Sequence, residues 1–208
     1  MNARQRWRDL WQRLGAHSLP ELIFNELVQF YRQSHRAYHT LDHIQDCLVQ
    51  FDQAPHLAER ENEVEMALWC HDVIYDPRAA DNEAQSAAWA AQVLQRGGIA
   101  PEVIAYVQAL IMVTQHQTQV AYPDAALVAD IDLSILGRPV AEFDQYEAAI
   151  RQEYQWVPDS AYREARIKVL ESFLARSSVF QTQTFRDRYE VSARDNLTRS
   201  IRRLHTTA

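Results

Sequence analysis

Glycine and proline are scarce in this sequence of 208 residues, which contains 4 glycines and 7 prolines. Because these two residues form most tight turns, their scarcity disfavours a fold of many short strands. No apolar run reaches the length that a membrane span needs, and the charged N-terminal stretch is not followed by the apolar core of a signal peptide. We therefore expect a cytoplasmic protein that does not associate with a membrane.

The sequence lacks the motifs that mark several functional classes. The two cysteines, Cys47 and Cys70, are too few for a disulfide framework, and their apolar surroundings predict buried free thiols. There is no glycine-rich phosphate loop and no Gly-x-Ser-x-Gly elbow, so P-loop and serine-hydrolase chemistry are disfavoured. The net charge of −7 disfavours a nucleic-acid polymer as partner. A small anionic substrate remains compatible with it, because a bound metal reverses the local potential.

The residues that are present favour helices. Hydrophobic residues make up 47% of the chain, and Ala, Leu, Gln, Glu and Arg, which are good helix formers, are abundant. Apolar residues recur at spacings of three and four along most of the sequence, as in amphipathic helices. The length suits one domain with helical extensions at both ends. The sequence therefore predicts an all-α protein, and its amphipathic ends are compatible with a homodimer.

The segment 67–76 contains the first candidate for chemistry. Its apolar run ends in the adjacent pair His71 and Asp72. Imidazole and carboxylate are both good ligands for a divalent metal, and a buried charged Asp is costly unless it is paired or bound to a cation. Taken alone, the pair is more typical of a core histidine bonded to an aspartate at the end of a helix. The rest of the sequence decides between these interpretations.

Two further segments accompany this pair. Upstream, His39 and His43 are four residues apart, a spacing that places two side chains on one face of a helix. Helical patterning is broken before Leu41, so we expect a helix to begin near that residue and to carry His43 in its first turn. Downstream, Asp130 and Asp132 lie among apolar residues.

This ordered set of His, His-Asp and Asp resembles the HD superfamily of metal-dependent phosphohydrolases. In that family four such residues hold one divalent ion at the centre of a helical bundle. The resemblance covers about residues 36–137 and implies a single HD-type domain over residues 1–208, with C-terminal helices over 138–208. The implied metal ligands are His43, His71, Asp72 and Asp132.

Two short sequence motifs are also similar to metal-binding motifs of cyclic-nucleotide phosphodiesterases. In the first, Tyr38-His39-x-x-x-His43, the resemblance makes His43 the ligand and His39 a proton donor. In the second, Ile131-Asp132-Leu133-Ser134, it favours Asp132 over Asp130 as the last ligand. The expected activity is hydrolysis of a phosphoester or phosphoanhydride, with a nucleotide or another small phosphorylated metabolite as substrate. Mixed nitrogen and oxygen ligands suit manganese, cobalt, nickel, iron or zinc better than calcium.

Four other residues are secondary candidates, each with a structural alternative. Asp76 is a second candidate for proton transfer, or it caps the loop after the pair. Arg36 contacts a phosphate or forms an ordinary ion pair. Glu83 points into the site from the first turn of a helix, or it complements the helix dipole. His116 binds a second metal or a phosphate, or it is a solvated residue at a helix end.

Two rival functions stay open at this stage. The first is a di-iron oxygenase of the HD type, which needs more His and Asp ligands than the sequence places. The second is a non-catalytic nucleotide-binding or regulatory HD protein. The number of metal ions and the native metal are also open.

Overall fold

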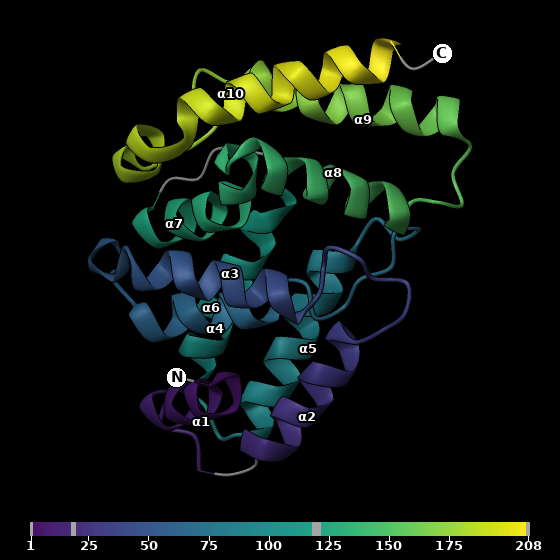
Figure 1. The fold of residues 1–208 in the computed structure, drawn as a ribbon. Helices are drawn as coiled ribbons and strands as arrows, with labels where there is room; N and C mark the ends of the chain where they lie inside the picture. The colour runs from purple at the N-terminus through teal and green to yellow at the C-terminus, as the bar shows by residue number, and fades with distance from the viewer. Residues whose placement is uncertain (1, 18–19, 118–121, 207–208) are drawn as a thin grey trace. The chain divides into compact units, whose positions relative to one another are not determined.

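The computed structural model describes residues 2–17, 20–117 and 122–206. Within these ranges the regular structure is entirely helical, with ten α-helices and three short 3-10 helices, so the predicted all-α fold class is confirmed (Figure 1). The helices are α1 (Ala3–Arg13), α2 (Pro20–Tyr31), α3 (Leu41–Asp52), η1 (Pro55–Leu57), α4 (Glu61–Cys70), α5 (Asn82–Arg96), α6 (Pro101–Met112), η2 (Val113–Gln115), α7 (Pro123–Asp132), η3 (Leu133–Gly137), α8 (Val140–Glu153), α9 (Asp159–Leu174) and α10 (Gln183–Thr206).

The chain divides into two compact units, Met1–Ile131 and Asp132–Ala208. The boundary falls at the last residue of α7, six residues before the start of the predicted C-terminal helices at residue 138. That the whole chain forms one domain stays a prediction.

Helix α4 lies at the centre of the first unit. It packs against α1, α3, α5 and α6, and every residue from Glu63 to Cys70 is buried. Its sequence combines good helix formers with two glutamates in the first turn, which complement the helix dipole. Burial continues past the last residue of α4: His71 is buried, and Asp72, which follows it, is half-buried.

Helix α1 closes one side of the first unit with aromatic side chains. Trp7 and Trp11 stack with their ring centroids 5.6 Å apart, and Trp7 meets Trp69 of α4 edge to face at the same separation. Trp11 also lies so close to Gly97 that a Cβ atom there would be 2.6 Å from the indole. These contacts pack α1 onto the rest of the first unit.

The second unit is built from η3, α8, α9 and α10. Helix α10 packs along α9 and against η3 (Figure 1). At the contact with η3, the backbone of Gly137 lies directly against Tyr189, where no Cβ atom fits. Helix α10 begins at Gln183, and before it the Thr182 hydroxyl accepts a hydrogen bond from the N–H of Phe185.

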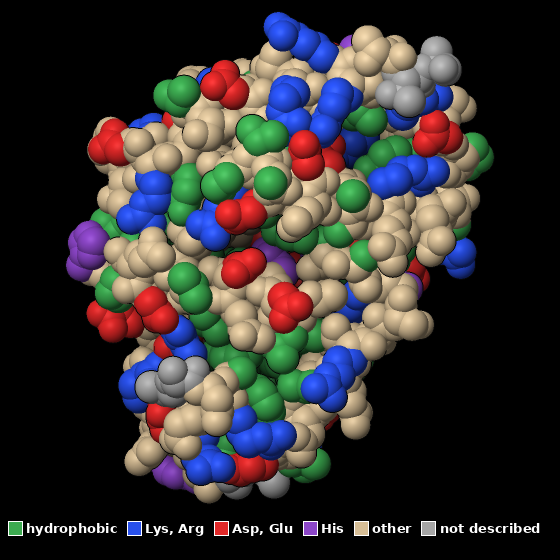
Figure 2. All heavy atoms as spheres, viewed as in Figure 1, with side chains coloured by type: hydrophobic (Ala, Val, Ile, Leu, Met, Phe, Trp, Pro, Cys, Tyr) green, Lys and Arg blue, Asp and Glu red, His purple; other side chains and the backbone are tan. Residues whose placement is uncertain are grey.

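Basic side chains gather over α9 and α10 on the face drawn in Figure 2. Arg199 and Arg203 of α10 both pair with Asp144 of α8, at 2.8 Å. These ion pairs join the C-terminal part of α10 to α8. None of the helices in the described ranges is both long and apolar enough to cross a membrane.

Candidate metal centre

Helix α3 positions the first predicted ligand. The helix begins after Thr40, whose hydroxyl accepts a hydrogen bond from the N–H of Asp42, as an N-cap residue does. His43 thus lies in the first turn and is buried, 5% exposed. The predicted helix start near Leu41 and the inward orientation of His43 are both confirmed. His39 precedes the N-cap, so the helical spacing of four residues does not apply to the pair His39 and His43.

The end of α4 positions the next two predicted ligands, His71 and Asp72. His71 is the C-cap of α4 in a right-handed helical conformation, and its N–H donates to the carbonyl of Ala67. Asp72 follows in a turn. This turn brings the adjacent side chains together instead of spreading them along a helix, and Nε2 of His71 lies 3.1 Å from Oδ2 of Asp72.

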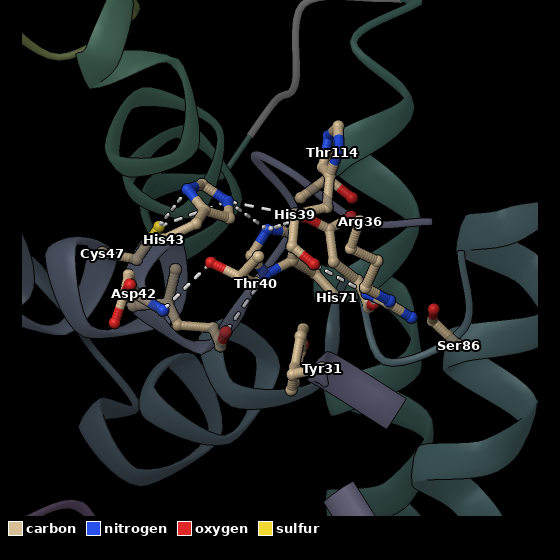
Figure 3. Close-up of polar contacts among 12 residues, drawn as sticks. Tyr31, Arg36, His39, Thr40, Asp42, His43, Cys47, His71, Ser86 and Thr114 are labelled. Carbon is tan, nitrogen blue, oxygen red and sulfur yellow. Dashed lines mark hydrogen bonds and ion pairs between the residues drawn. The ribbon is translucent and has the colours of Figure 1, made fainter. Parts of the chain in front are cut away.

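Three ligand atoms converge at this point. Nε2 of His43 lies 3.2 Å from Nε2 of His71 (Figure 3). It lies 3.4 Å from Oδ2 of Asp72. Two atoms bound about 2.0–2.1 Å from one ion at a tetrahedral angle lie about 3.3 Å apart. The three separations of this cluster are close to that value, so the donor set fits a single divalent ion.

The hydrogen bonding of His71 shows which of its nitrogens can bind a metal. Nδ1 lies 3.0 Å from the carbonyl oxygen of Leu68. Since a carbonyl can only accept, Nδ1 is the donor of this bond, and Nε2 is the nitrogen that faces the cluster. A backbone carbonyl bonded to the far nitrogen is the usual support of a metal-bound histidine. A proton shared within the cluster would satisfy one pair of atoms, whereas a cation would satisfy all three.

The electrostatics of the cluster keep Asp72 ionised. Burial acts to raise the pKa of its carboxyl. The charges of His71 and His39 and hydrogen bonds from His43 and His71 lower this pKa, and together they outweigh the effect of burial. The pKa of Asp72 is therefore held well below its usual range. The carboxylate is available as a ligand at neutral pH.

Aromatic rings surround the cluster on the side of the loop before α3. The ring of His39 stacks on Tyr75 with centroids 4.1 Å apart, and Tyr38 packs against His43 at 4.7 Å. His35 donates from Nε2 to the carbonyl of Tyr75 over 2.8 Å. These contacts hold the imidazole of His39 beside the ligands, with 6.2 Å between the ring centroids of His39 and His43.

Arg36 fastens this loop to the residues after α4. Its guanidinium donates to the carbonyls of His39, Asp72 and Val73 over 2.7–2.9 Å, and the side chain is buried. It also lies over the ring of Tyr31, 5.2 Å from the centroid. These contacts give Arg36 a positioning role, and the predicted phosphate contact stays a prediction.

The contacts of two secondary candidates are mainly local. Asp76 is exposed, and its carboxylate accepts the N–H of Arg78 while its backbone exchanges hydrogen bonds with Asn82. This is the loop-capping arrangement that the sequence left as an alternative. Glu83 lies half-buried in the first turn of α5. Roles in proton transfer for Asp76 and at the site for Glu83 stay predictions.

The remaining candidates lie after α6. His116 ends η2 in the left-handed region, with φ of 54°, and among the described residues no other non-glycine residue has a positive φ. Asp130 is fully buried in α7, and Asp132, half-buried, is the last residue of that helix. The assignment of Asp132 as the fourth ligand and the role of His116 both stay predictions.

One residue that the sequence placed only in the core lies at the cluster. One ligand atom each from His43, Cys47 and His71 lie within 4.8 Å of one another, a group that could hold a metal ion. The signal was present in the sequence, because Cys47 follows His43 by one helical turn and so shares its face.

In comparisons with known proteins, no family model, curated protein or solved structure matches the chain at a significant level.

Proposed function

We propose that this chain is a metal-dependent phosphohydrolase of the HD type, which cleaves a phosphoester or phosphoanhydride bond in a nucleotide or another small phosphorylated metabolite. The observation that carries the proposal is the convergence of His43, His71 and Asp72, whose ligand atoms lie 3.1–3.4 Å apart. The hydrogen bond from Nδ1 of His71 to the carbonyl of Leu68 supports it, because such a bond orients Nε2 toward the other two ligand atoms.

In this proposal His43, His71 and Asp72 hold a divalent transition metal: manganese, cobalt, nickel, iron or zinc. The fourth ligand, Asp132, is assigned by the resemblance of its motif. When bound, such an ion polarises a phosphoryl oxygen and lowers the pKa of a coordinated water. The carboxylate of Asp72 is ionised at neutral pH, as a metal ligand must be.

His39 is the favoured residue for proton transfer. Its ring is half-buried, stacked on Tyr75 and close to the ligands, so it can deliver a proton to the leaving oxygen of the substrate. Asp76 is the less favoured candidate, because its carboxylate is engaged by the N–H of Arg78 on the exposed loop.

The first experiment measures the metal content of the purified chain by elemental mass spectrometry. We expect about one transition metal per chain in the wild type and its loss in His71→Gln and Asp72→Asn. His56→Ala is the matched control, because His56 is exposed in η1 and should leave the metal content unchanged. Circular dichroism confirms that each variant is folded. A metal content that survives both His71→Gln and Asp72→Asn would overturn the site.

The fourth ligand is tested in the same series. Asp132→Asn should lower the metal content, whereas Asp130→Asn should retain it. The reverse result would make Asp130 the ligand and the motif assignment wrong.

Activity is tested with bis(4-nitrophenyl) phosphate and a panel of nucleotides in the presence of manganese. Hydrolysis by the wild type and its loss in His39→Ala with metal content retained are the expected results. Two irons per chain would instead support oxygenase chemistry. Tight nucleotide binding without turnover would support a regulatory protein.

A further inference from the structure

A cluster of tyrosine and arginine side chains joins α8 to α9 in the second unit. Tyr162 and Arg166 are four residues apart on α9, so their side chains leave the same face of that helix. The guanidinium of Arg166 donates from Nε to Glu147 of α8 over 3.1 Å and from Nη2 to the hydroxyl of Tyr146 over 2.9 Å. It also lies over the ring of Tyr146, 5.3 Å from the centroid.

The side chains of this cluster are largely withdrawn from solvent. The side chain of Arg166 is 10% exposed, that of Glu147 is 11% exposed, and Tyr162 is 7% exposed. Burial raises the pKa of the Tyr162 hydroxyl to about 12. This hydroxyl therefore keeps its proton at neutral pH and can donate it to an acceptor.

Two donors of the cluster are not used by the rest of the described chain. A guanidinium carries N–H groups on each of its nitrogens, but the hydrogen bonds of Arg166 to described residues leave from Nε and Nη2 alone. In the same ranges the Tyr162 hydroxyl has no hydrogen-bond partner, and its ring contacts Tyr154 and Arg151. Neither donor is fully enclosed, because Nε1 of Trp69 is the only enclosed side-chain nitrogen or oxygen of the described residues that lacks a partner. Both donors are therefore open to a small molecule that accepts hydrogen bonds.

Asp132 belongs to the same unit and lies near this cluster. Burial raises the pKa of the Tyr146 hydroxyl, and the charge of Asp132 adds to this increase. Because such an effect weakens with distance, Asp132 lies in the neighbourhood of the hydroxyl that Arg166 contacts. A phosphoryl group held beside Asp132 would thus be close to the donors of the cluster.

We propose that Arg166 and Tyr162 form a subsite of the second unit that binds the phosphoryl oxygens of the substrate beside Asp132. The inference rests on the proposed function, in which Asp132 is a metal ligand and the substrate carries a phosphoryl group. Hydrogen bonds from a guanidinium to a phosphate oxygen are among the strong ones, because both partners are charged. Glu147 orients the guanidinium through Nε and Nη2, which leaves Nη1 for the substrate.

The first test is Tyr162→Phe, which removes only the hydroxyl. With bis(4-nitrophenyl) phosphate and manganese, KM should rise at least about fivefold while kcat changes little, as for the loss of a binding contact. The free energy of unfolding in urea should not fall, because the hydroxyl has no hydrogen bond within the described chain to lose. Tyr122→Phe, which removes a hydroxyl of the first unit, is the matched control and should leave KM unchanged.

Calorimetric titration of the full-length chain with inorganic phosphate measures the subsite without turnover. The wild type should bind phosphate, and Tyr162→Phe should weaken this binding at least about fivefold. Arg166→Lys keeps the positive charge but loses the planar fork, so it should weaken the binding by about tenfold or more. Tyr122→Phe should bind phosphate as the wild type does.

The outcomes separate the two proposals. Wild-type KM and phosphate affinity in Tyr162→Phe would overturn the subsite and leave metal-dependent hydrolysis standing. A fall in the free energy of unfolding of Tyr162→Phe alongside weaker binding would also overturn it, because the hydroxyl would then support the fold. Phosphate binding that depends on Tyr162 in a wild-type chain that neither holds metal nor hydrolyses substrate would overturn the proposed function and keep an anion site at these residues.

Discussion

The guanidinium of Arg36 donates a hydrogen bond of 2.7 Å to the carbonyl oxygen of Asp72. The same nitrogen donates to the carbonyl of His39 over 2.9 Å. One buried cation thus joins the loop that carries the candidate proton donor to the backbone of a candidate metal ligand. The relative placement of His39 and Asp72 depends on this link as well as on the helices.

Replacing Arg36 should therefore loosen the metal centre. Arg36→Lys keeps the charge but cannot reproduce the planar fork that reaches three carbonyls, so buried acceptors lose their donors. We expect a loss of about 2–4 kcal/mol in the free energy of unfolding, measured by urea denaturation, and weaker metal binding. Arg32→Lys, an exposed change at the end of α2, is the control. Equal unfolding midpoints for the two variants would contradict the positioning role.

A second link of this kind lies at the start of α4. Asp124 of α7 is completely buried, and its carboxylate accepts the backbone N–H groups of Glu59 and Arg60 at 2.7 and 3.0 Å and the hydroxyl of Tyr106 at 3.0 Å. Arg60 is the N-cap residue of α4, and its own side chain forms no capping hydrogen bond. A carboxylate from a distant helix therefore binds the chain at the N-terminal end of the central helix and complements its dipole.

Asp124→Ala should therefore destabilise the first unit strongly. Two backbone N–H groups and one hydroxyl lose their acceptor, so we expect the free energy of unfolding to fall by about 2–4 kcal/mol. Tyr106→Phe removes one of the three bonds and should cost about 1 kcal/mol. Urea denaturation followed by circular dichroism measures both. Asp46→Ala, at an exposed position of α3, should change stability little, and a similar loss there would show that Asp124 has no special role.

The fold class and the start of α3 could be predicted from the sequence, because apolar spacing and breaks in it are local signals. The orientation of His43 followed from its place in the first turn of an amphipathic helix. Asp124 could not be recognised, since its partners Glu59 and Arg60 are 65 and 64 residues away and no local pattern marks them. Long-range hydrogen bonds depend on tertiary packing, which periodicity does not encode.

The candidate site shows the same limit. The adjacency of His71 and Asp72 was visible in the sequence, but their convergence depends on a turn after α4 that no residue signals. Arg36 was interpreted as a phosphate contact or an ion pair, because an arginine near a metal motif is typical of both. Three of its partners are backbone carbonyls, which a sequence does not single out.

Glu190 makes the stability of the second unit depend on pH. Its carboxylate in α10 accepts the N–H groups of Val179 and Phe180 at 3.0–3.2 Å and the hydroxyl of Ser178 at 2.9 Å, and it pairs with Arg194 at 2.7 Å. Partial burial acts to raise the pKa of Glu190, but these bonds outweigh it, so the pKa lies below its ordinary value of 4.5. The folded state thus favours the ionised carboxylate.

A depressed pKa stabilises the fold above the pKa of the unfolded chain, and this stabilisation is lost as the pH falls through the folded value. Glu190→Gln should lower the free energy of unfolding by about 1–2 kcal/mol at neutral pH, since it replaces charged hydrogen bonds by weaker neutral ones. The difference from the wild type should shrink as the pH falls below 4.5, where the wild-type carboxyl begins to be protonated. Urea denaturation at a series of pH values measures this, with Glu164→Gln on the exposed face of α9 as the control. A difference that stays constant down to the acid limb would mean that the shape of the side chain, and not its charge, holds the segment 178–180.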